Sequence, residues 1–560
     1  MVIVIFDIFV AFFHGKARLV LYVVPPKDLR KPGVIWRLLK SLYGTRDASQ
    51  VFAEYVSDSL RAESHERSCI SPCLYFSEEL ENLMAHHGDD FIGALPESQL
   101  ETLKDIMNRR FKVKFAKVVG EGFDSEVDFL HRRVLYTGRG FAWEQNEKYV
   151  KEMIKGFGWE IEERMKSDVW NMTVTPGSKT IGNTRDSADK LDPEACTTFR
   201  SQVGLALYIG QDRPECQFAT KEAARHMSNP TRFAQLAVRR LAKYYSEAPC
   251  LRWEFEFQDM PASVYVVTDA NWAGDTEGMR STSCGWIYFG GHLLETYSST
   301  QQIVALSTAE SEYIAITKGA AHGLELRSVL LELGFEVPVI VASDSKAGRA
   351  MATRRGVGRV RHLDARLLCV QELVGEGVLK METRLGEENE ADIGTKHLDI
   401  NRMTKLMKKS PLRPPKGWFQ WVVASVGYRG AAANNRVVDS SAVACYAVKE
   451  DIESQAWTVG LAMLLAVAMS VCIALACARR ALRESVGTKS EKATQTSDQS
   501  SPAYCGMLVD DLRRECVLRN LVVARTKLEI VDVLLQSDVE KLDRPEAWLS
   551  LRVTTNEYRA

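Results

Sequence analysis

Short apolar runs separated by turn residues fill the first hundred positions, a pattern typical of a mixed α/β unit. The opening run MVIVIFDIFVAFF predicts a buried strand that leads directly into Asp7. Further on, MAHHGDDFIGALPES predicts a strand, a turn and a second strand, with Asp89 and Asp90 at the tip. LETLKDIMNRRF has helical spacing, and VDFLHRRVLYTGRGFAWEQ predicts two strands around the turn at residues 137–140. Acidic residues are therefore expected at strand ends in this region.

A second alternating region places acids in the same way. VYVVTDANWAG predicts a strand ending at Asp269, STSCGWIYFGGHLLETYS a hairpin, and TAESEYIAITKGAAHGLELRSVLLELGF a long helix that carries Glu312. VPVIVASDSKAG predicts a strand that ends at Asp344, and Asp392 lies in ENEADIGTKHL, at the expected start of a terminal helix. The order β-β-β-α-β with acids at strand ends is typical of a catalytic site at a sheet edge.

The segment of residues 454–478, SQAWTVGLAMLLAVAMSVCIALACA, contains no charged residue and is long enough to span a bilayer as a helix. Acids precede it and Arg479, Arg480 and Arg483 follow it, so the positive-inside rule places its C-terminal side in the cytoplasm. We therefore expect a transmembrane helix here, and a membrane location if that helix forms; otherwise the location is cytoplasm or nucleus.

Length, net charge and cysteine content narrow the possible classes of protein further. The 560 residues predict roughly three or four domains. With 72 basic and 73 acidic residues the net charge is −1, which excludes a globally basic nucleic-acid binder and leaves local patches. The 12 cysteines are scattered without a CxxC pair, so reduced, buried thiols are expected rather than disulfides or a zinc site.

Four acids of the second region could form a metal site. Asp269, Glu312, Asp344 and Asp392 come from the ends of different elements, and four converging carboxylates could hold two divalent cations. Hard oxygen ligands suit Mg²⁺ or Mn²⁺. Any one of these acids alone would be a solvated surface group, and the hypothesis depends on all four.

STAESEYIAI, SDSKAG, VRHLDARLL, ENEADIGTKHL and TDANWAGDTEGMRSTSCGWIYFGG together resemble the ribonuclease H region of copia-type retrotransposon polyproteins. The resemblance implies that Asp269, Glu312, Asp344 and Asp392 are the metal-binding carboxylates of an enzyme that cleaves RNA in RNA–DNA hybrids. Glu310 competes with Glu312 for its place, and the pattern E-Y-x-A favours Glu312.

FDIFVAFFHGKARLVLYVVPP and VIWRLLKSLYGTRDASQVF resemble the palm of the copia-type reverse transcriptase. HHGDDFIGAL then falls on the aromatic-x-Asp-Asp hairpin of that family, which implies that Asp7, Asp89 and Asp90 are a metal-binding triad. Phe12 matches the residue that stacks against the incoming deoxynucleotide and excludes a ribose by clash. The alternative for Phe12 is a plain core residue. The expected partners are an RNA template, DNA and deoxynucleotides.

Several residues depart from the family pattern. His87 and Gly88 replace an aromatic–aliphatic pair, which should loosen the hairpin, and Asp47 replaces a glutamine. The fingers before Asp7 are not found, so we expect an N-terminally truncated polymerase unit with impaired activity. The basic stretches 354–355, 359–361 and 405–409 are candidate contacts to the substrate, or solvated faces.

The tail MLVDDLRRECVLRNLVVARTKLEIVDVLLQ resembles a SAP motif, which implies DNA binding through residues 507–535; Arg525 stands where that motif has glycine. A helical hairpin that binds a protein is the alternative.

The expected fold class is multidomain α+β and α/β: a partial polymerase palm, a ribonuclease H-like mixed sheet with helices, a transmembrane helix and a small helical module. The expected domains are 1–175 (palm and following segment), 176–255 (helical connection), 256–410 (ribonuclease H-like), 411–453 (linker), 454–478 (transmembrane), 479–504 (disordered linker) and 505–545 (SAP-like). Two further hypotheses stay open: a membrane-anchored scaffold without catalysis, and a decayed element that never folds stably.

Overall fold

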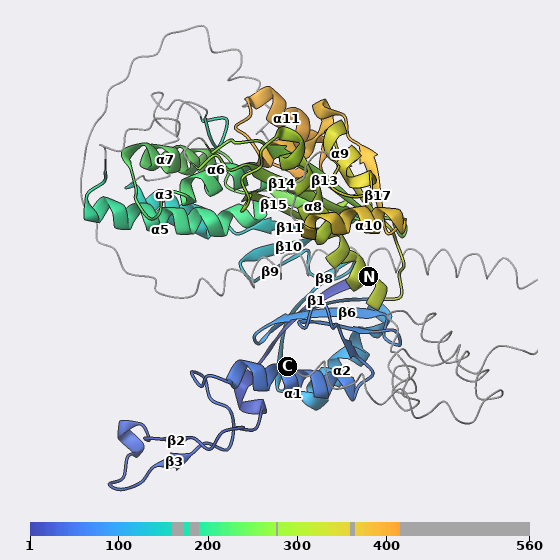
Figure 1. Cartoon of the computed structure of the whole chain (residues 1–560). Helices are drawn as coiled ribbons and strands as arrows, with labels where there is room; N and C mark the ends of the chain where they lie inside the picture. Colours follow the sequence, from blue (N-terminus) through green and yellow to red (C-terminus); the bar gives the residue numbers. More distant parts are fainter. Residues whose placement is uncertain (159–172, 179–189, 276–277, 359–364, 415–560) are drawn as a thin grey trace, which may run out of the picture. The chain divides into compact units, whose positions relative to one another are not determined.

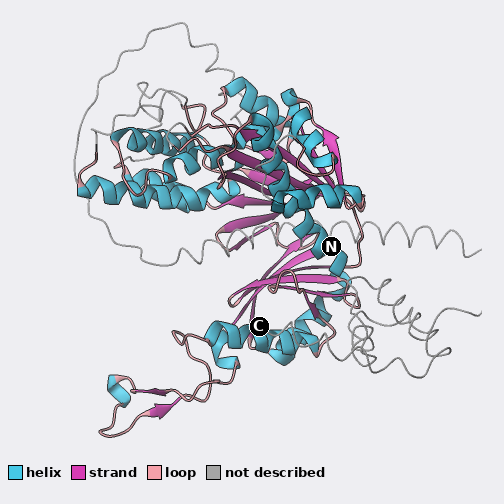
Figure 2. Cartoon of the chain, viewed as in Figure 1, coloured by secondary structure: helices cyan, strands magenta, loops and turns pink. Residues whose placement is uncertain are grey.

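The computed structural model describes residues 1–158, 173–178, 190–275, 278–358 and 365–414. All of them belong to the first of two units into which the chain divides, Met1–Leu482. The described residues form a mixed α+β fold with three larger sheets and helices packed against them (Figure 1). The secondary-structure colouring in Figure 2 shows helices against each of these sheets.

The first sheet has the strand order β4-β5-β6-β7-β1-β8, with antiparallel neighbours. Its strands are β1 (Val2–Ile8), β4 (Glu66–Arg67), β5 (Leu74–Ser77), β6 (Asn82–His87), β7 (Asp90–Leu95) and β8 (Val113–Gly120). The even-numbered residues of β1 share a core with helices α1 (Ala48–Arg61) and α2 (Leu100–Arg110), whereas Ile3 and Ile5 join the core on the other face. Strand β1 is thus buried on both faces, as its apolar run from Val2 to Phe6 predicts.

The second sheet has the order β18-β12-β11-β10-β9 and is also antiparallel. Its strands are β9 (Glu126–Phe129), β10 (Arg132–Tyr136), β11 (Gly140–Gln145), β12 (Arg252–Glu256) and β18 (Leu412–Arg413). The helices of this part are α3 (Lys148–Gly156), α5 (Pro193–Ile209), α6 (Pro214–Ala224) and α7 (Arg232–Glu247). The two strands predicted around residues 137–140 are confirmed, and the expected domain boundaries remain predictions.

The third sheet has the order β15-β14-β13-β16-β17. Strand β14 is antiparallel to both of its neighbours, β13 and β15, whereas β16 and β17 run parallel to β13. The strands are β13 (Val264–Asn271), β14 (Thr282–Phe289), β15 (His292–Thr300), β16 (Val339–Ser343) and β17 (Leu379–Thr383). The helices are α8 (Thr308–Glu332), α9 (Lys346–Thr353), α10 (Cys369–Gly375) and α11 (Ile400–Lys409). The predicted order β-β-β-α-β is confirmed.

Short elements complete the described part of the chain. They are the strand pair β2 (Tyr22–Val23) and β3 (Trp36–Arg37) and the 3-10 helices η1 (Ala11–His14), η2 (Lys27–Leu29), η3 (Glu97–Gln99), η4 (Gly210–Asp212), η5 (Ala365–Leu368), η6 (Gly386–Glu388) and η7 (Glu390–Gly394). Asp392 lies in η7 and not at the start of α11, because Asp399 caps α11 instead.

The predicted fold class was wrong in including a transmembrane helix. Among the residues that the structure describes, none of the helices is both long and apolar enough to cross a membrane. The segment 454–478 and the SAP-like tail at 505–545 lie outside the described residues. The corrected class is a mixed α+β multidomain fold.

The cysteines differ in part from expectation. Seven cysteines fall within the described residues, and all seven are free thiols, so the prediction of reduced thiols is confirmed for them. Only Cys216 and Cys284 of these seven are buried, so the prediction of burial was wrong for the other five.

Candidate active site

Three of the predicted acids meet at one edge of the third sheet. Asp269 lies near the C-terminal end of β13 and Asp344 directly follows β16, which is parallel to β13. Because parallel strands end at the same sheet edge, the two carboxylates lie close together. Glu312, near the start of α8, completes the group, and oxygens of all three lie within 4.8 Å of one another.

Glycines bring α8 close enough to the sheet for this contact. A Cβ atom at Gly319 would lie 2.4 Å from Cγ2 of Thr268, and one at Gly323 would lie 2.6 Å from Cγ1 of Val339. The two glycines are one helical turn apart and so face the same side. Their missing side chains allow the close approach that sets Glu312 beside Asp269.

The site is strongly desolvated on one side. Asp269 and Glu312 are only 3% and 6% exposed, whereas Asp344 is open to solvent. Burial, followed by the charges of Asp269 and Asp344, raises the pKa of Glu312 to about 9. Burial also raises the pKa of Asp269 to about 7 and that of Asp344 above its usual range. Three carboxylates so close together repel one another unless a proton or a cation lies between them.

The structure separates Glu312 from its competitor Glu310. Ser307 caps α8 by accepting a hydrogen bond from the Glu310 N–H, and Glu310 Oε2 accepts one of 2.8 Å from the Leu306 N–H. This resembles a capping box, except that the Glu310 carboxylate accepts from the residue before the cap, and it gives Glu310 a structural role at the helix start. Glu312 Oε2, in contrast, is buried and has no hydrogen-bond partner.

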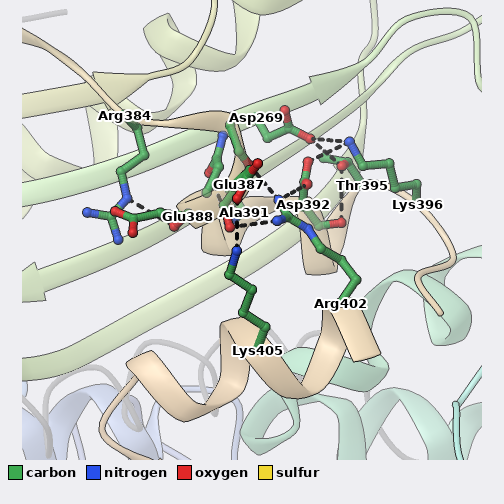
Figure 3. Close-up of polar contacts among 12 residues, drawn as sticks. Asp269, Arg384, Glu387, Glu388, Ala391, Asp392, Thr395, Lys396, Arg402 and Lys405 are labelled. Carbon is green, nitrogen blue, oxygen red and sulfur yellow. Dashed lines mark hydrogen bonds and ion pairs between the residues drawn. The ribbon is translucent and has the colours of Figure 1, made fainter. Parts of the chain in front are cut away.

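The fourth acid, Asp392, is held by two cationic side chains (Figure 3). Lys396 Nζ lies 2.5 Å from Asp392 Oδ1, and Arg402 Nη2 lies 2.8 Å from Asp392 Oδ2. Lys396 also lies 3.8 Å from Asp269 Oδ2, which accepts a hydrogen bond from the Thr395 hydroxyl. Asp392 therefore adjoins the three-acid group through Lys396.

These residues fit a divalent metal ion of the magnesium type. The group offers hard carboxylate oxygens without imidazole or thiol, which Mg²⁺ and Mn²⁺ prefer. The unpartnered Glu312 Oε2 is a second observation, because a buried carboxylate oxygen without a hydrogen-bond donor is costly unless a cation binds it.

The acids of the first sheet meet less closely. Asp7 on β1 is paired in register with Asp90 on β7, and the Ile8 N–H donates a hydrogen bond of 3.0 Å to the Asp89 carbonyl. Burial, then the charge of Asp89, raises the pKa of both Asp7 and Asp90. Of the residues that the structure describes, however, only the Asp269 group brings three such side chains within 4.8 Å.

The hairpin that carries Asp89 and Asp90 is tight. His87 pairs with Asp90, so that only Gly88 and Asp89 form the loop. Gly88 has φ 61°, in the left-handed region that a type II′ turn requires at its first loop position. The expectation that Gly88 loosens the hairpin was wrong, because glycine allows this two-residue turn.

Phe12 lies in η1 and is partly buried. Its ring centroid is 4.5 Å from that of Tyr43 and 5.9 Å from that of Phe52, which belongs to the core under α1. Burial, followed by Asp89 and Asp7, raises the pKa of the Tyr43 hydroxyl, which places Tyr43 near both acids. Phe12 thus packs against both the core and Tyr43, and its contact with a nucleotide stays a prediction.

Known proteins resemble this chain in sequence. A family of reverse transcriptases (RNA-dependent DNA polymerases) matches residues 1–157. The retrovirus-related Pol polyprotein from transposon TNT 1-94 of Nicotiana tabacum is 26% identical over 409 residues, covering 71% of this chain and 30% of that protein. The corresponding polyprotein from transposon RE2 of Arabidopsis thaliana is 25% identical, covering 70% of this chain and 26% of that protein. The chain is related to copia-type retrotransposon Pol polyproteins.

The match to the reverse transcriptase family covers residues 1–157. The chain spans less than a third of the length of these two relatives. Among solved structures, LC11-RNase H1 in complex with RNA/DNA hybrid matches 24% of this chain and 94% of its own, at 18% identity and a TM-score of 0.18. A TM-score this low does not establish a shared fold.

The predicted substrate contacts of this chain are partly engaged in ion pairs. Lys405 pairs with Glu387 at 3.0 Å, and Lys409 pairs with Glu388. Arg355 is exposed, and residues 359 and 361 lie outside the described part of the chain. The stretch 405–409 is therefore largely neutralised by η6.

Sequence reasoning missed three residues that shape the site: Thr395, Lys396 and Arg402. A signal for Lys396 was present, since it follows Asp392 by four residues in ENEADIGTKHL, a spacing that brings side chains together on a helix. Arg402 had no such signal, because its contact with Asp392 depends on how α11 packs against η7.

Proposed function

We propose that this chain cleaves the RNA strand of RNA–DNA hybrids at the site formed by Asp269, Glu312 and Asp344. The observation that carries the proposal is the convergence of the three carboxylates within 4.8 Å, one of them with a buried, unpartnered oxygen. Magnesium-type ions, when bound, supply an activated water and stabilise the leaving oxygen of a phosphodiester.

The chain's own residues prepare the site for such ions. Asp269 and Glu312 are both buried, and Thr395 orients Asp269 by a hydrogen bond. Asp344 faces solvent, where a nucleic-acid backbone can approach. The raised pKa of Glu312 means that metal binding releases a proton from this carboxyl below about pH 9.

DNA synthesis at Asp7, Asp89 and Asp90 is the second proposed activity, with an RNA template and deoxynucleotides as substrates. The family match and the Asp7–Asp90 pairing support it. The looser grouping of these acids, with Asp47 at the N-terminus of α1 and His87 before the turn, supports a reduced rate. A scaffold without catalysis is the alternative for this half.

The test uses the full chain with a labelled RNA–DNA hybrid and Mg²⁺. We expect metal-dependent cleavage of the RNA strand, lost by at least about a hundredfold in Asp344→Asn, since a removed metal ligand costs this much or more. Asp399→Asn, which alters only the cap of α11, should leave cleavage close to that of the unmodified chain. A folded protein that does not cleave would favour the scaffold.

A further inference from the structure

Lys396 lies between two carboxylates of the site. Its ammonium is 2.5 Å from Asp392 Oδ1 and 3.8 Å from Asp269 Oδ2, which belong to η7 and β13. Figure 3 shows the side chain reaching both acids from the residues that follow η7. One positive charge thus interacts with two carboxylates that would otherwise repel each other.

Asp392 has both oxygens engaged. Oδ1 faces Lys396, and Oδ2 accepts a hydrogen bond from Arg402, which also donates to the carbonyls of Gly386 and Glu387. Arg402 is therefore tied to η6 at several points, whereas Lys396 makes its two contacts with carboxylates only. Of the two cations, Lys396 is the one that can leave at the smaller cost.

The surroundings leave room for that movement. The Lys396 side chain is 41% exposed, in contrast to the buried Asp269 and Thr395 beside it. It also lines a cavity of about 630 Å³ that is bordered by Arg240, His397 and Arg402. A flexible four-carbon chain can carry its ammonium into this space.

We propose that Lys396 is a built-in cation that occupies the Asp269–Asp392 pair, and that Asp392 becomes a metal ligand only when Lys396 withdraws. This inference rests on the proposed function. Its consequence is that a first divalent ion binds to Asp269, Glu312 and Asp344 more tightly than a second ion binds beside Asp392. Lys396 is a positioning residue in this scheme, and it sets the concentration at which the second ion binds.

Isothermal titration calorimetry of the full chain with Mn²⁺ alone tests the inference without any substrate. Lys396→Met should tighten the second binding step by about fivefold to tenfold, the effect of removing one charge at about 4 Å in a largely solvated site. Lys396→Arg keeps the charge and should behave as the unmodified chain does. Lys405→Met is the matched control, because Lys405 pairs with Glu387 and not with Asp269 or Asp392.

Thermal unfolding gives a second readout. In EDTA, Lys396→Met should unfold at a lower temperature, because Asp269 then loses its neighbouring cation and Asp392 keeps only Arg402. Saturating Mn²⁺ should largely remove this difference. Lys396→Gln repeats both measurements with a second neutral side chain, in case the methionine variant does not fold.

Second-step binding that is unchanged or weaker in folded Lys396→Met and Lys396→Gln would overturn the inference, as would a single binding step in every variant. Asp269→Asn separates this outcome from failure of the proposed function. If the unmodified chain and Asp269→Asn bind the same amount of Mn²⁺, the metal site itself is absent and both proposals are wrong.

Discussion

Gly319 on α8 lies directly against Thr268 on β13, so that a Cβ atom at Gly319 would be 2.4 Å from Thr268 Cγ2. Thr268 is fully buried and is the residue before Asp269, so it cannot move aside without disturbing the site. The spacing between this helix and this strand decides whether Glu312 and Asp269 can share a metal ion.

Gly319→Ala should therefore lower the free energy of unfolding by about 1–3 kcal/mol through overpacking, and it should reduce hybrid cleavage more than its stability loss explains. Urea unfolding and initial cleavage rates measure the two effects. Gly204→Ala on α5 is the control, because nothing lies within 4 Å of its Cβ position, and alanine there should stabilise the helix slightly. If both variants had the same stability and the same cleavage rate, the contact between Gly319 and Thr268 would not be important for the site.

The acids at the third sheet were predictable from sequence because two parallel strands that end in an acid must end at the same edge. Asp269 and Asp344 illustrate this, and Glu312, which the pattern E-Y-x-A favours over Glu310, lies beside them in the structure. The surroundings of Asp392 were predicted less well. Its ion pairs with Lys396 and Arg402 arise from the packing of η7 and α11, and the local pattern of apolar and polar residues does not reveal that packing.

The Asp-Asp hairpin shows the other limit. The sequence predicted its strands and turn, but the loosening expected from Gly88 was wrong, since only the backbone angle reveals a tight two-residue loop. Glycine has a low propensity for strands, but Gly88 lies in the turn itself, where that propensity does not apply.

Gly88→Ala should reduce the free energy of unfolding by about 1–2 kcal/mol, because an alanine at φ 61° is strained although its Cβ meets no neighbour. Urea unfolding followed by circular dichroism measures this. Gly375→Ala in α10, where the space is also open and φ is not left-handed, should cause no such loss. A Gly88→Ala protein as stable as the unmodified chain would mean that the turn is not of this type.

The metal-free protein should lose stability as pH rises. The pKa values of Glu312, about 9, and Asp269, about 7, exceed the ordinary carboxyl value, about 4, so the folded state binds more protons than the unfolded state between these values. The contribution of these groups to the free energy of unfolding is therefore highest near pH 4 and falls towards pH 9. Thermal unfolding in EDTA from pH 5 to pH 9 measures the slope.

Glu312→Gln should flatten that slope, because the amide does not titrate, and Mg²⁺ should flatten it as well by stabilising the ionised acids. A slope of the same size in Glu312→Gln would show that other groups cause the pH dependence.

The most direct test of the account compares hybrid cleavage by two variants of the same helix, Glu312→Gln and Glu310→Gln, in the full chain with Mg²⁺. Glu312 is assigned to the metal site and Glu310 to the helix cap, where glutamine can also accept the hydrogen bond from Leu306. We predict that Glu312→Gln loses at least about a hundredfold in rate, while Glu310→Gln stays within about threefold of the unmodified chain, since a cap change affects mainly stability. Equal loss in both variants, or unimpaired cleavage by Glu312→Gln, would contradict the proposed active site.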